Sequence, residues 1–345
     1  MTFRDTEKAR YRTLKANLFS SAACSPGSYR GRLRPFCLAD GHSAENLYES
    51  LREDAIAYFR DRRIPWHDGW PDREGKGRAL PSNHLCCSQT ACVNALWPLV
   101  QDSQLLAKVF RPFIPELAKP LPFDADGLLS DGTVPFLAFE WIGAKNYLGE
   151  VSWGTRGANA TSADFSFRFR RYDGRVHLVL GEWKYTEYYG KKVKDPESIN
   201  RTRLRTYREA FHHWKASQLD LPPYHTFFVE PFYQLMRQTL LAQEMERGGS
   251  RGAGEMEADI VSVIHVAPKA NQEFGKSFEA APCLSRYGRT VGAAWTQVAP
   301  EDRFLSISSE SLLTLIEQVA SASLRPWTDY LLARYGWWRG GMEIH

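Results

Sequence analysis

The sequence predicts an α/β fold in which helices flank a mixed central β-sheet, and three observations lead to this class. Polar residues alternate with Phe165, Phe167 and Phe169, which is the period of two expected of a strand. The apolar run at residues 176–180 predicts a second strand that is covered on both faces. The tripeptide Asp-Pro-Glu at residues 195–197 is typical of a helix start and predicts a long helix after these strands.

The elements that precede the two strands are expected to be helical, with one strand between them and the hairpin. Residues 44–63 predict an amphipathic helix whose apolar side chains point inward. Those side chains are Leu47, Leu51 and Tyr58. Residues 84–97 predict a second helix, because Ser82 or Asn83 can cap its first turn. Its apolar stripe consists of Leu85, Cys92, Leu96 and Leu99. The segment 134–143 is apolar and predicts the first strand of the sheet.

Helices and strands are expected to alternate after the paired strands. The helix that starts at Asp195 continues to about Ala216, with an apolar stripe that faces the sheet. That stripe consists of Leu204, Tyr207, Phe211 and Trp214. A short apolar strand at residues 225–230, a helix at 231–246 and a strand at 258–267 follow. The resulting order is αβββαβ plus an additional helix and strand.

Length and composition are consistent with three regions in the 345-residue chain. Residues 1–80 are expected to form an N-terminal extension of helices and loops, and residues 81–270 the α/β core. Residues 271–345 are expected to form a C-terminal helical extension that packs on the core. This last region contains an apolar helix at 311–320 and a segment rich in aromatic residues and arginine at 327–341. Aromatic side chains interleaved with arginine can stack on bases, but core packing is their commoner role.

Several classes of protein are disfavoured by the composition. No apolar run reaches the ~18 residues that a membrane span needs, and the N-terminal segment lacks the apolar stretch of a secretory signal. The six cysteines show no paired C-x-x-C spacing, so neither a zinc site nor a disulfide framework is indicated. We therefore expect a cytoplasmic protein without a membrane partner. Because the formal net charge is only +4, any affinity for nucleic acid must come from local patches.

The turn between the two paired strands decides which polar side chains meet. A two-residue loop at positions 173–174 would pair Asp164 with Trp183 and direct Glu182 and Lys184 to the other face. A three-residue loop, with its glycine in the left-handed conformation, pairs Asp164 with Glu182 and places Lys184 on the same face. The sequence Tyr-Asp-Gly suits the three-residue loop, and a one-residue slip of the register is the alternative.

Charged side chains stand at the end of a strand that is predicted to be buried on both faces. An exposed Glu182–Lys184 pair would be a solvated ladder that contributes only about 0.3 kcal/mol. Buried charges are costly unless they are paired or bound to a metal. The carboxylates of Asp164 and Glu182 are hard oxygen ligands of the kind that Mg²⁺ accepts, with water and substrate phosphate completing its octahedron. The context therefore favours a functional site over a surface ladder.

The arrangement of Asp164, Glu182 and Lys184 resembles that of the PD-(D/E)XK, or restriction-endonuclease-like, nuclease superfamily. In that superfamily an acidic residue opens one strand and the motif D/E-x-K closes the next. The strings RGANATSAD and EWKYTE are also similar to a bacterial group of proteins labelled as restriction endonucleases. The resemblance covers roughly residues 82–246, and Ala163 stands where the superfamily signature has proline. It implies a restriction-endonuclease-like αβββαβ core.

The resemblance also implies an activity, namely Mg²⁺- or Mn²⁺-dependent cleavage of DNA by an endonuclease, with a role in restriction or antiphage defence. Asp164, Glu182 and the backbone carbonyl of Trp183 would ligate the metal. Lys184 would orient or deprotonate the attacking water and help to neutralise the developing charge. The competing hypothesis is a nucleic-acid-binding protein on the same fold that no longer cleaves, and the intact acidic residues and lysine argue against it. The oligomeric state is left open, with a homodimer as one option.

Four further polar residues compete for supporting roles, and for each of them an ordinary structural hydrogen bond is the alternative. Glu150 lies between the first strand and Asp164 and is the preferred third carboxylate and metal ligand. Gln89 follows, because the resembled superfamily often places an acid or an amide on the first helix beside its active site. Glu187 ranks third, since it is expected on the opposite face, and Glu140 ranks fourth.

A basic stripe on the helix after the hairpin suggests nucleic acid as the partner, with DNA favoured over RNA. The stripe follows helical spacing and consists of Arg201, Arg205, Arg208, His212 and Lys215. Lys191, Lys192 and Lys194 lie just upstream of it. A basic helix face is usually only solvated, but this stripe starts a few residues from the paired carboxylates. A phosphate backbone that must be gripped near the site explains that proximity better.

Overall fold

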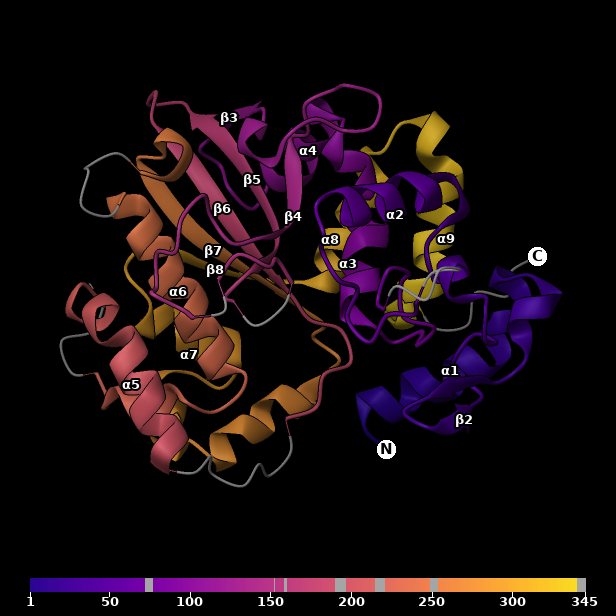
Figure 1. Ribbon diagram of the computed structural model, residues 1–345, viewed down its shortest axis with the longest axis horizontal. Helices are drawn as coiled ribbons and strands as arrows, with labels where there is room; N and C mark the ends of the chain where they lie inside the picture. The colour runs from indigo at the N-terminus through magenta and orange to yellow at the C-terminus, as the bar shows by residue number, and fades with distance from the viewer. Residues whose placement is uncertain are drawn as a thin grey trace.

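The computed structural model describes residues 1–71, 77–151, 153–157, 160–189, 197–214, 221–248 and 254–339. A mixed β-sheet lies between two layers of helices (Figure 1). Six strands of the described residues form this sheet, and their bounds are β3 Leu117–Leu121, β4 Leu137–Trp141, β5 Ala163–Arg171, β6 Val176–Trp183, β7 Ile260–Ala267 and β8 Phe304–Ser308. The family of folds that the sequence predicts, α/β with a mixed central sheet, is confirmed.

The strand order is β3-β5-β6-β7-β8, and β4 also pairs with β5. The pairs on the β5 side are antiparallel, whereas β6–β7 and β7–β8 are parallel. Parallel neighbours need a crossover connection, and the segment between β6 and β7 supplies it with two helices, α5 Glu197–His212 and α6 Phe232–Arg247. The carboxyl ends of the three parallel strands therefore share one edge of the sheet.

Each face of the sheet is covered by its own helices (Figure 1). One face carries α5, α6 and α7, of which α7 spans Val291–Val298. The helices packed on the other face are α2 Arg52–Asp61, α3 Ser88–Leu96, α4 Ser103–Phe110, α8 Ser309–Val319 and α9 Arg325–Tyr335. Beyond them lie α1 Phe3–Leu18 and a two-stranded hairpin of β1 Gly27–Tyr29 and β2 Arg32–Arg34. Among the described residues, no helix is long and apolar enough to span a membrane.

The phenylalanines of β5 cover one face of the sheet, whereas β6 is covered on both faces. Phe165, Phe167 and Phe169 are fully buried against α3 and α4, in the cluster that also contains Val179 of β6. The intervening positions of β6, Leu178 and Leu180, are buried on the other face against α5 and α6. The prediction of a strand covered on both faces is confirmed, since every residue of β6 is buried.

The turn of the β5–β6 hairpin has the three-residue form. Arg170 pairs with Val176, and the Arg171 N–H donates to the Arg175 carbonyl at 2.9 Å, which leaves three residues in the loop. Gly174 ends that loop with φ +88°, a left-handed conformation that a side chain rarely adopts. The same register continues away from the turn as far as the pair Phe165–Gly181. The predicted register is thus confirmed.

Some predicted elements differ from the structure. Residues 225–230 do not form a strand, because the chain makes a 3₁₀ turn at Tyr224–Phe227 that buries Phe227 and Phe228 against the α6 face. A short apolar run does not distinguish a strand from a buried turn by periodicity. The helix predicted from residue 84 begins at Ser88. Asn83 does not cap that helix, because its side-chain amide donates to the carbonyls of Ser28 and Leu38.

Two helices are shorter than predicted. The amphipathic helix at 44–63 forms only over α2, although Leu47, Leu51 and Tyr58 do point inward. The helix α5 ends at His212, and its stripe is only partly buried, because Leu204 is 37% exposed. Its predicted start at Asp195 and Pro196 lies outside the described residues.

The chain ends are not separate from the core. One hydrophobic cluster contains Tyr11, Phe110, Phe165, Trp327 and Tyr335, which come from all three predicted regions. The region after residue 270 also supplies β8, so it is not helical throughout as predicted. In the segment rich in aromatic residues and arginine, Trp327, Arg334 and Tyr335 are buried, which confirms core packing for these residues. The three-part division of the chain itself remains a prediction.

Candidate active site

A cavity of about 310 Å³ opens where β4, β5 and β6 approach α3 and α6. Its lining is strongly polar. The charged and amide side chains in that lining are Gln89, Glu140, Asp164, Glu182, Lys184, Glu187, Gln234, Arg237 and Gln238. Three of them, Asp164, Glu182 and Lys184, are the residues that the hairpin register was expected to bring together. We call this space the catalytic cavity.

The hairpin positions Asp164 and Glu182 opposite each other at the end of the ladder. Phe165 pairs with Gly181, so the next residues outward are Asp164 on β5 and Glu182 on β6. The Trp183 N–H donates to Asp164 Oδ2 at 2.6 Å, which fixes that carboxylate against the partner strand. Gly181 is needed directly below, since a Cβ there would lie 2.2 Å from the ring of Phe165. The two acidic side chains therefore share one face of the sheet.

Lys184 lies on the same face and is held by α6. Its Nζ lies 2.5 Å from Glu182 Oε1 and donates to Gln234 Oε1 at 2.7 Å. Gln238, one helical turn further along α6, donates from Nε2 to Glu182 Oε2 at 3.0 Å. Glu182 and Lys184 are 2% and 5% exposed, so this ion pair is almost completely removed from water. The α6 glutamines thus orient both charged side chains.

Glu140 adds a third carboxylate to the same row. The pairs Phe139–Phe165 and Trp141–Ala163 flank it, so Glu140 lies beside Asp164 in the β4–β5 ladder. Its backbone has φ +53°, which breaks the regular alternation of the strand. The carboxylate accepts a hydrogen bond from Gln89 Nε2 at 2.7 Å. Ser162 Oγ donates to its other oxygen at 2.8 Å, and these bonds hold Glu140 in the cavity.

Burial and the nearby carboxylates raise the pKa of two acidic groups in the cavity, Asp164 and Glu140. Burial raises the pKa of Asp164 well above its usual range, and the neighbouring charges of Glu182 and Glu140 raise it further. Burial also raises the pKa of Glu140, with a further contribution from Glu182. Burial alone would lower the pKa of Lys184, but the surrounding acidic groups, with Glu182 foremost, raise it well above its usual value. The site therefore carries more acidic groups than its one ammonium can neutralise.

The donor set fits a hard divalent cation. No three His, Cys, Asp or Glu side chains in the described ranges are already gathered into a complete metal site. The Lys184 ammonium instead occupies the position beside Glu182. The carboxylate oxygens of Asp164 and Glu182 and the adjacent carbonyl of Trp183 are nevertheless the ligand type that Mg²⁺ and Mn²⁺ prefer. A cation would also relieve the repulsion that raises the pKa of Asp164.

The structure separates Glu150 from the catalytic cavity. Its carboxylate accepts hydrogen bonds from the Thr161 N–H at 2.6 Å, from Thr161 Oγ1 at 2.7 Å and from Tyr207 OH at 2.8 Å. Arg237 forms an ion pair with it at 3.1 Å. Both oxygens are thus occupied, and Glu150 holds the loop before β5. Among the four supporting candidates, the geometry places Glu140 rather than Glu150 beside Asp164.

The two other supporting candidates lie in the cavity wall. Gln89 bridges the loop and the strand, because it accepts from the His67 N–H at 2.7 Å while donating to Glu140. Glu187 lines the cavity because the strand ends at Trp183 and the chain turns, which invalidates the expectation of the opposite face. Its Oε2 accepts from the Tyr185 N–H at 2.6 Å. Gln89 and Glu187 each accept a hydrogen bond from a backbone N–H group and so hold the cavity wall in place.

The basic stripe of α5 is exposed at four of the predicted positions, Arg201, Arg205, Arg208 and His212. Lys191, Lys192, Lys194 and Lys215 lie outside the described residues. Sequence reasoning missed Gln234 and Gln238, which the structure brings to the acidic cluster. The available signal was a pair of glutamines one turn apart on α6, between apolar positions that are buried.

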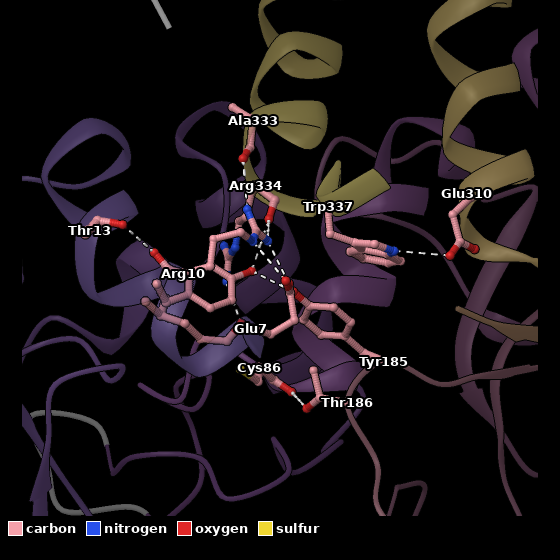
Figure 2. A network of polar contacts seen from close by, with 12 residues as sticks. Glu7, Arg10, Thr13, Cys86, Tyr185, Thr186, Glu310, Ala333, Arg334 and Trp337 are labelled. Carbon is pink, nitrogen blue, oxygen red and sulfur yellow. Dashed lines mark hydrogen bonds and ion pairs between the residues drawn. The ribbon is translucent and has the colours of Figure 1, made fainter. Parts of the chain in front are cut away.

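A buried polar network fixes the chain directly after Lys184 (Figure 2). Tyr185 OH donates to Glu7 on α1, and the Glu7 carboxylate also pairs with Arg10 at 2.7 Å. Arg10 in turn donates to the carbonyl of Arg334 on α9. Asn271 Nδ2 donates to the Tyr185 carbonyl at 3.1 Å. Helices α1 and α9 therefore meet at the residue that follows Lys184.

Glu7→Ala is expected to destabilise the protein strongly, because it removes the acceptor that the buried Tyr185 hydroxyl shares with the half-buried Arg10. Removing one partner of a buried ion pair typically costs about 3–5 kcal/mol. Asp329→Ala is the matched control, since its ion pair with Arg325 is 65–68% exposed and should be worth less than about 1 kcal/mol. Urea unfolding followed by circular dichroism measures both. Equal losses for the two variants would show that the network is not stabilising.

The chain was compared with protein-family models, curated proteins and solved structures. A family model described as "Restriction Endonuclease associating with ARP" matches residues 9–336. No curated protein and no solved structure matches. The matched span includes every residue of the catalytic cavity, the whole of α9 and α1 from residue 9 onward.

Proposed function

The chain belongs to the family of restriction endonucleases associating with ARP, and from this premise we propose that it is a metal-dependent nuclease that hydrolyses phosphodiester bonds in DNA. One observation carries the proposal. Asp164, Glu182 and Lys184 lie together in an open polar cavity at the end of the β5–β6 hairpin. Buried charges of this kind are costly to the fold, and they are retained where chemistry requires them.

The metal would be held by Asp164, Glu182 and the backbone carbonyl of Trp183, with Glu140 as the third carboxylate in preference to Glu150. Mg²⁺ or Mn²⁺ bound there supplies a Lewis acid that polarises the phosphate and lowers the pKa of a bound water. Gln238 fixes Glu182, and Gln89 with Ser162 fixes Glu140. These hydrogen bonds restrict the orientation of the two carboxylates, as the outer shell of a metal site does.

Lys184 is protonated and can therefore donate hydrogen bonds. Its pKa is raised by Glu182, so the side chain is an ammonium in the metal-free protein. Its role is then to orient the attacking water and to neutralise the charge that develops on the phosphate oxygens. Gln234 Oε1 also accepts a hydrogen bond from Nζ, so the ammonium would keep one partner in the cavity if Glu182 held a metal.

The DNA backbone would be gripped by the exposed stripe of α5, together with Lys191 and Lys192 upstream. Arg201, Arg205 and Arg208 stand on the surface of α5, while Tyr207 of the same helix is buried and donates to Glu150. Tyr207 thereby links the basic helix to the loop that leads into β5. Glu150 in turn binds Thr161, which lines the catalytic cavity, so this contact connects the helix of the stripe to the cavity wall.

Replacing Arg201, Arg205 and Arg208 together by alanine is expected to weaken DNA binding and to flatten its salt dependence. Each lost phosphate contact changes the slope of log K against log salt by about 0.9. The fold should persist, because Tyr207 and Phe211 supply the buried face of α5. Fluorescence anisotropy at several salt concentrations measures the slope. Arg325→Ala, another exposed arginine, is the control, and an unchanged slope in the triple variant would remove α5 from the interface.

The proposal is tested by incubating purified protein with circular and linear DNA and with RNA, in Mg²⁺, in Mn²⁺ and in EDTA. We expect DNA cleavage that requires the metal and produces cuts within circular DNA. A protein that binds DNA but cleaves no substrate with either metal would instead be the inactive nucleic-acid-binding protein. A role in restriction or antiphage defence rests on the family alone. The six unpaired cysteines, all within the described ranges, agree with a reducing compartment such as the cytoplasm.

A further inference from the structure

A second cavity, of about 570 Å³, lies at the carboxyl ends of β7 and β8. It is lined by the last residues of these parallel strands, by the segment 267–275 and by the first turn of α7. Open α/β sheets bind ligands beyond the carboxyl ends of their parallel strands. The volume lies within the usual range of small-molecule sites. None of its lining residues takes part in the catalytic cavity.

The second cavity adjoins the catalytic cavity across the sheet. His265 on β7 pairs in register with Glu182 on one side and with Ser306 on the other. A single polar row therefore runs from Asp164 through Glu182 and His265 to Ser306, on the face that α6 and α7 cover. The first half of this row lines the catalytic cavity, and His265 and Ser306 line the second cavity.

His265 is built into the wall without a hydrogen-bond partner. Its side chain is 3% exposed, and its ring packs between Phe274 and Phe304. Neither ring nitrogen has a partner within the part of the chain that the structure describes. Buried polar groups are almost always hydrogen-bonded, so an exception calls for a missing partner. A neutral imidazole offers one donor and one acceptor to such a partner.

Asn271 presents a second unused polar atom to the same cavity. Its Nδ2 donates to the carbonyls of Tyr185 at 3.1 Å and Glu187 at 3.0 Å, which ties it to the segment after the catalytic lysine. Its Oδ1 is buried and finds no partner among the described residues. His265 and Asn271 together offer one donor and two acceptors beside the ring of Phe274. That combination suits the edge and face of a nucleobase better than a bare anion.

The rim of the cavity is suited to a phosphate. Lys269 and Arg289 are exposed there, and the first turn of α7 carries no acidic residue. Gly292 brings that turn against β8, since a Cβ would lie 2.1 Å from Ser306 Oγ. Helix N-termini favour phosphate groups. The nearby carboxylate of Glu310 is already occupied by the N–H groups of residues 269 and 270 and by Trp337 Nε1.

We propose that the second cavity binds a single nucleotide, with the base against Phe274, His265 and Asn271 and the phosphate at Arg289 and the first turn of α7. The nucleotide has two sources with the same chemistry. It is either a free mononucleotide, which makes the site an effector site beside the catalytic row, or one unstacked nucleotide of a bound strand. The second source rests on the proposed nuclease function, whereas the first does not.

The test is calorimetric titration of the full chain in EDTA, with the four ribonucleoside 5′-monophosphates and with inorganic phosphate as separate probes. Because EDTA removes the metal, nucleotide binding is measured without cleavage. A protein that binds no nucleotide in this test could still be a nuclease, so the two proposals fail independently. We expect saturable binding of at least one mononucleotide and weaker binding of inorganic phosphate. A short single-stranded oligonucleotide is the second arm, and binding in that arm alone assigns the nucleotide to the strand.

Two variants locate the binding. His265→Phe keeps the ring between Phe274 and Phe304 but removes both nitrogens, so the melting temperature should be unchanged or higher. Affinity should fall roughly tenfold, as expected when a buried hydrogen bond is lost. Arg289→Ala should weaken binding of the phosphate-bearing probes, whereas Arg60→Ala, an exposed arginine outside both cavities, should not. The proposal is overturned if neither the mononucleotides nor the oligonucleotide binds. It is also overturned if His265→Phe binds the mononucleotides and the oligonucleotide as tightly as the unaltered protein does.

Discussion

Lys184→Ala is expected to slow metal-dependent cleavage of DNA by about 10²–10⁴-fold, the usual contribution of a positioned proton-transfer group. The binding of DNA and of the metal should be retained, because Lys184 ligates nothing in the proposed site. Cleavage rates under single-turnover conditions, with DNA affinity measured separately in Ca²⁺, distinguish the two. Lys119→Ala on the exposed edge strand β3 is the matched control and should cleave normally.

The same variant has a distinctive effect on stability. In the metal-free protein the Lys184 ammonium lies 2.5 Å from Glu182, and its removal leaves a buried carboxylate without a cation. The unfolding free energy should therefore fall by about 3–5 kcal/mol. Mn²⁺ can replace the lost charge, so it should raise the melting temperature of Lys184→Ala more than that of the unaltered protein. Equal metal-induced shifts would mean that the cation does not bind beside Glu182.

Asp164→Asn is expected to abolish cleavage and at the same time to stabilise the metal-free protein. The amide can still accept the hydrogen bond from the Trp183 N–H, so the local geometry is preserved. Loss of a ligand should weaken metal binding by at least the roughly 10–100-fold that supporting residues of metal sites contribute. The gain in stability has a different cause, namely the removal of a carboxyl group whose ionisation is opposed by burial and by Glu182 and Glu140.

The Asp164 carboxyl group should also make the free energy of unfolding depend on pH. The pKa of Asp164 in the folded protein lies above its ordinary value of 3.8, so the folded state binds more protons than the unfolded state above that pH. Stability from this group is therefore lost as pH rises from about 4 toward the folded pKa. Metal-free Asp164→Asn should show a flatter profile, measured by urea unfolding between pH 4 and 8.

An exposed aspartate provides the comparison. Asp54→Asn on α2 should leave both the cleavage rate and the pH profile of stability unchanged. If Asp164→Asn lowers stability at neutral pH and leaves the profile as steep as before, the carboxylate is a stabilising structural group. The proposed metal site would then lose its central residue.

Local chemistry was sufficient to predict the centre of the site. The register of the hairpin depends on three loop residues, and Tyr-Asp-Gly fixes them because glycine can adopt the left-handed conformation that closes the turn. Asp164 and Glu182 follow from that register. Gln234 and Gln238 do not, because their contact with the acidic pair depends on how α6 crosses the sheet. Such a crossing is set by packing between distant segments.

The ranking of Glu150 above Glu140 shows a second limit. In a regular strand, successive side chains point to opposite faces of the sheet. The left-handed backbone at Glu140 breaks this alternation, so the sequence pattern does not predict where its side chain points. Glu150, for its part, is held by Tyr207 and Arg237 from helices that the sequence places more than 50 residues away. Strand β8 and the 3₁₀ turn at Tyr224–Phe227 were missed for the related reason that short apolar segments take their conformation from what they pack against.

The meeting of α1 and α9 at Tyr185 also bears on when the site can form during folding. The contact between Arg10 and Arg334 spans 324 positions of the chain, and that between Tyr185 and Glu7 spans 178. Contacts of such long range require a long loop of chain to close before they can form. The segment that carries Lys184 should thus become ordered only after the helix containing Arg334 has been synthesised and docked. If the cavity cleaves DNA as proposed, a nascent chain that has not yet reached Arg334 would lack an ordered cleaving centre.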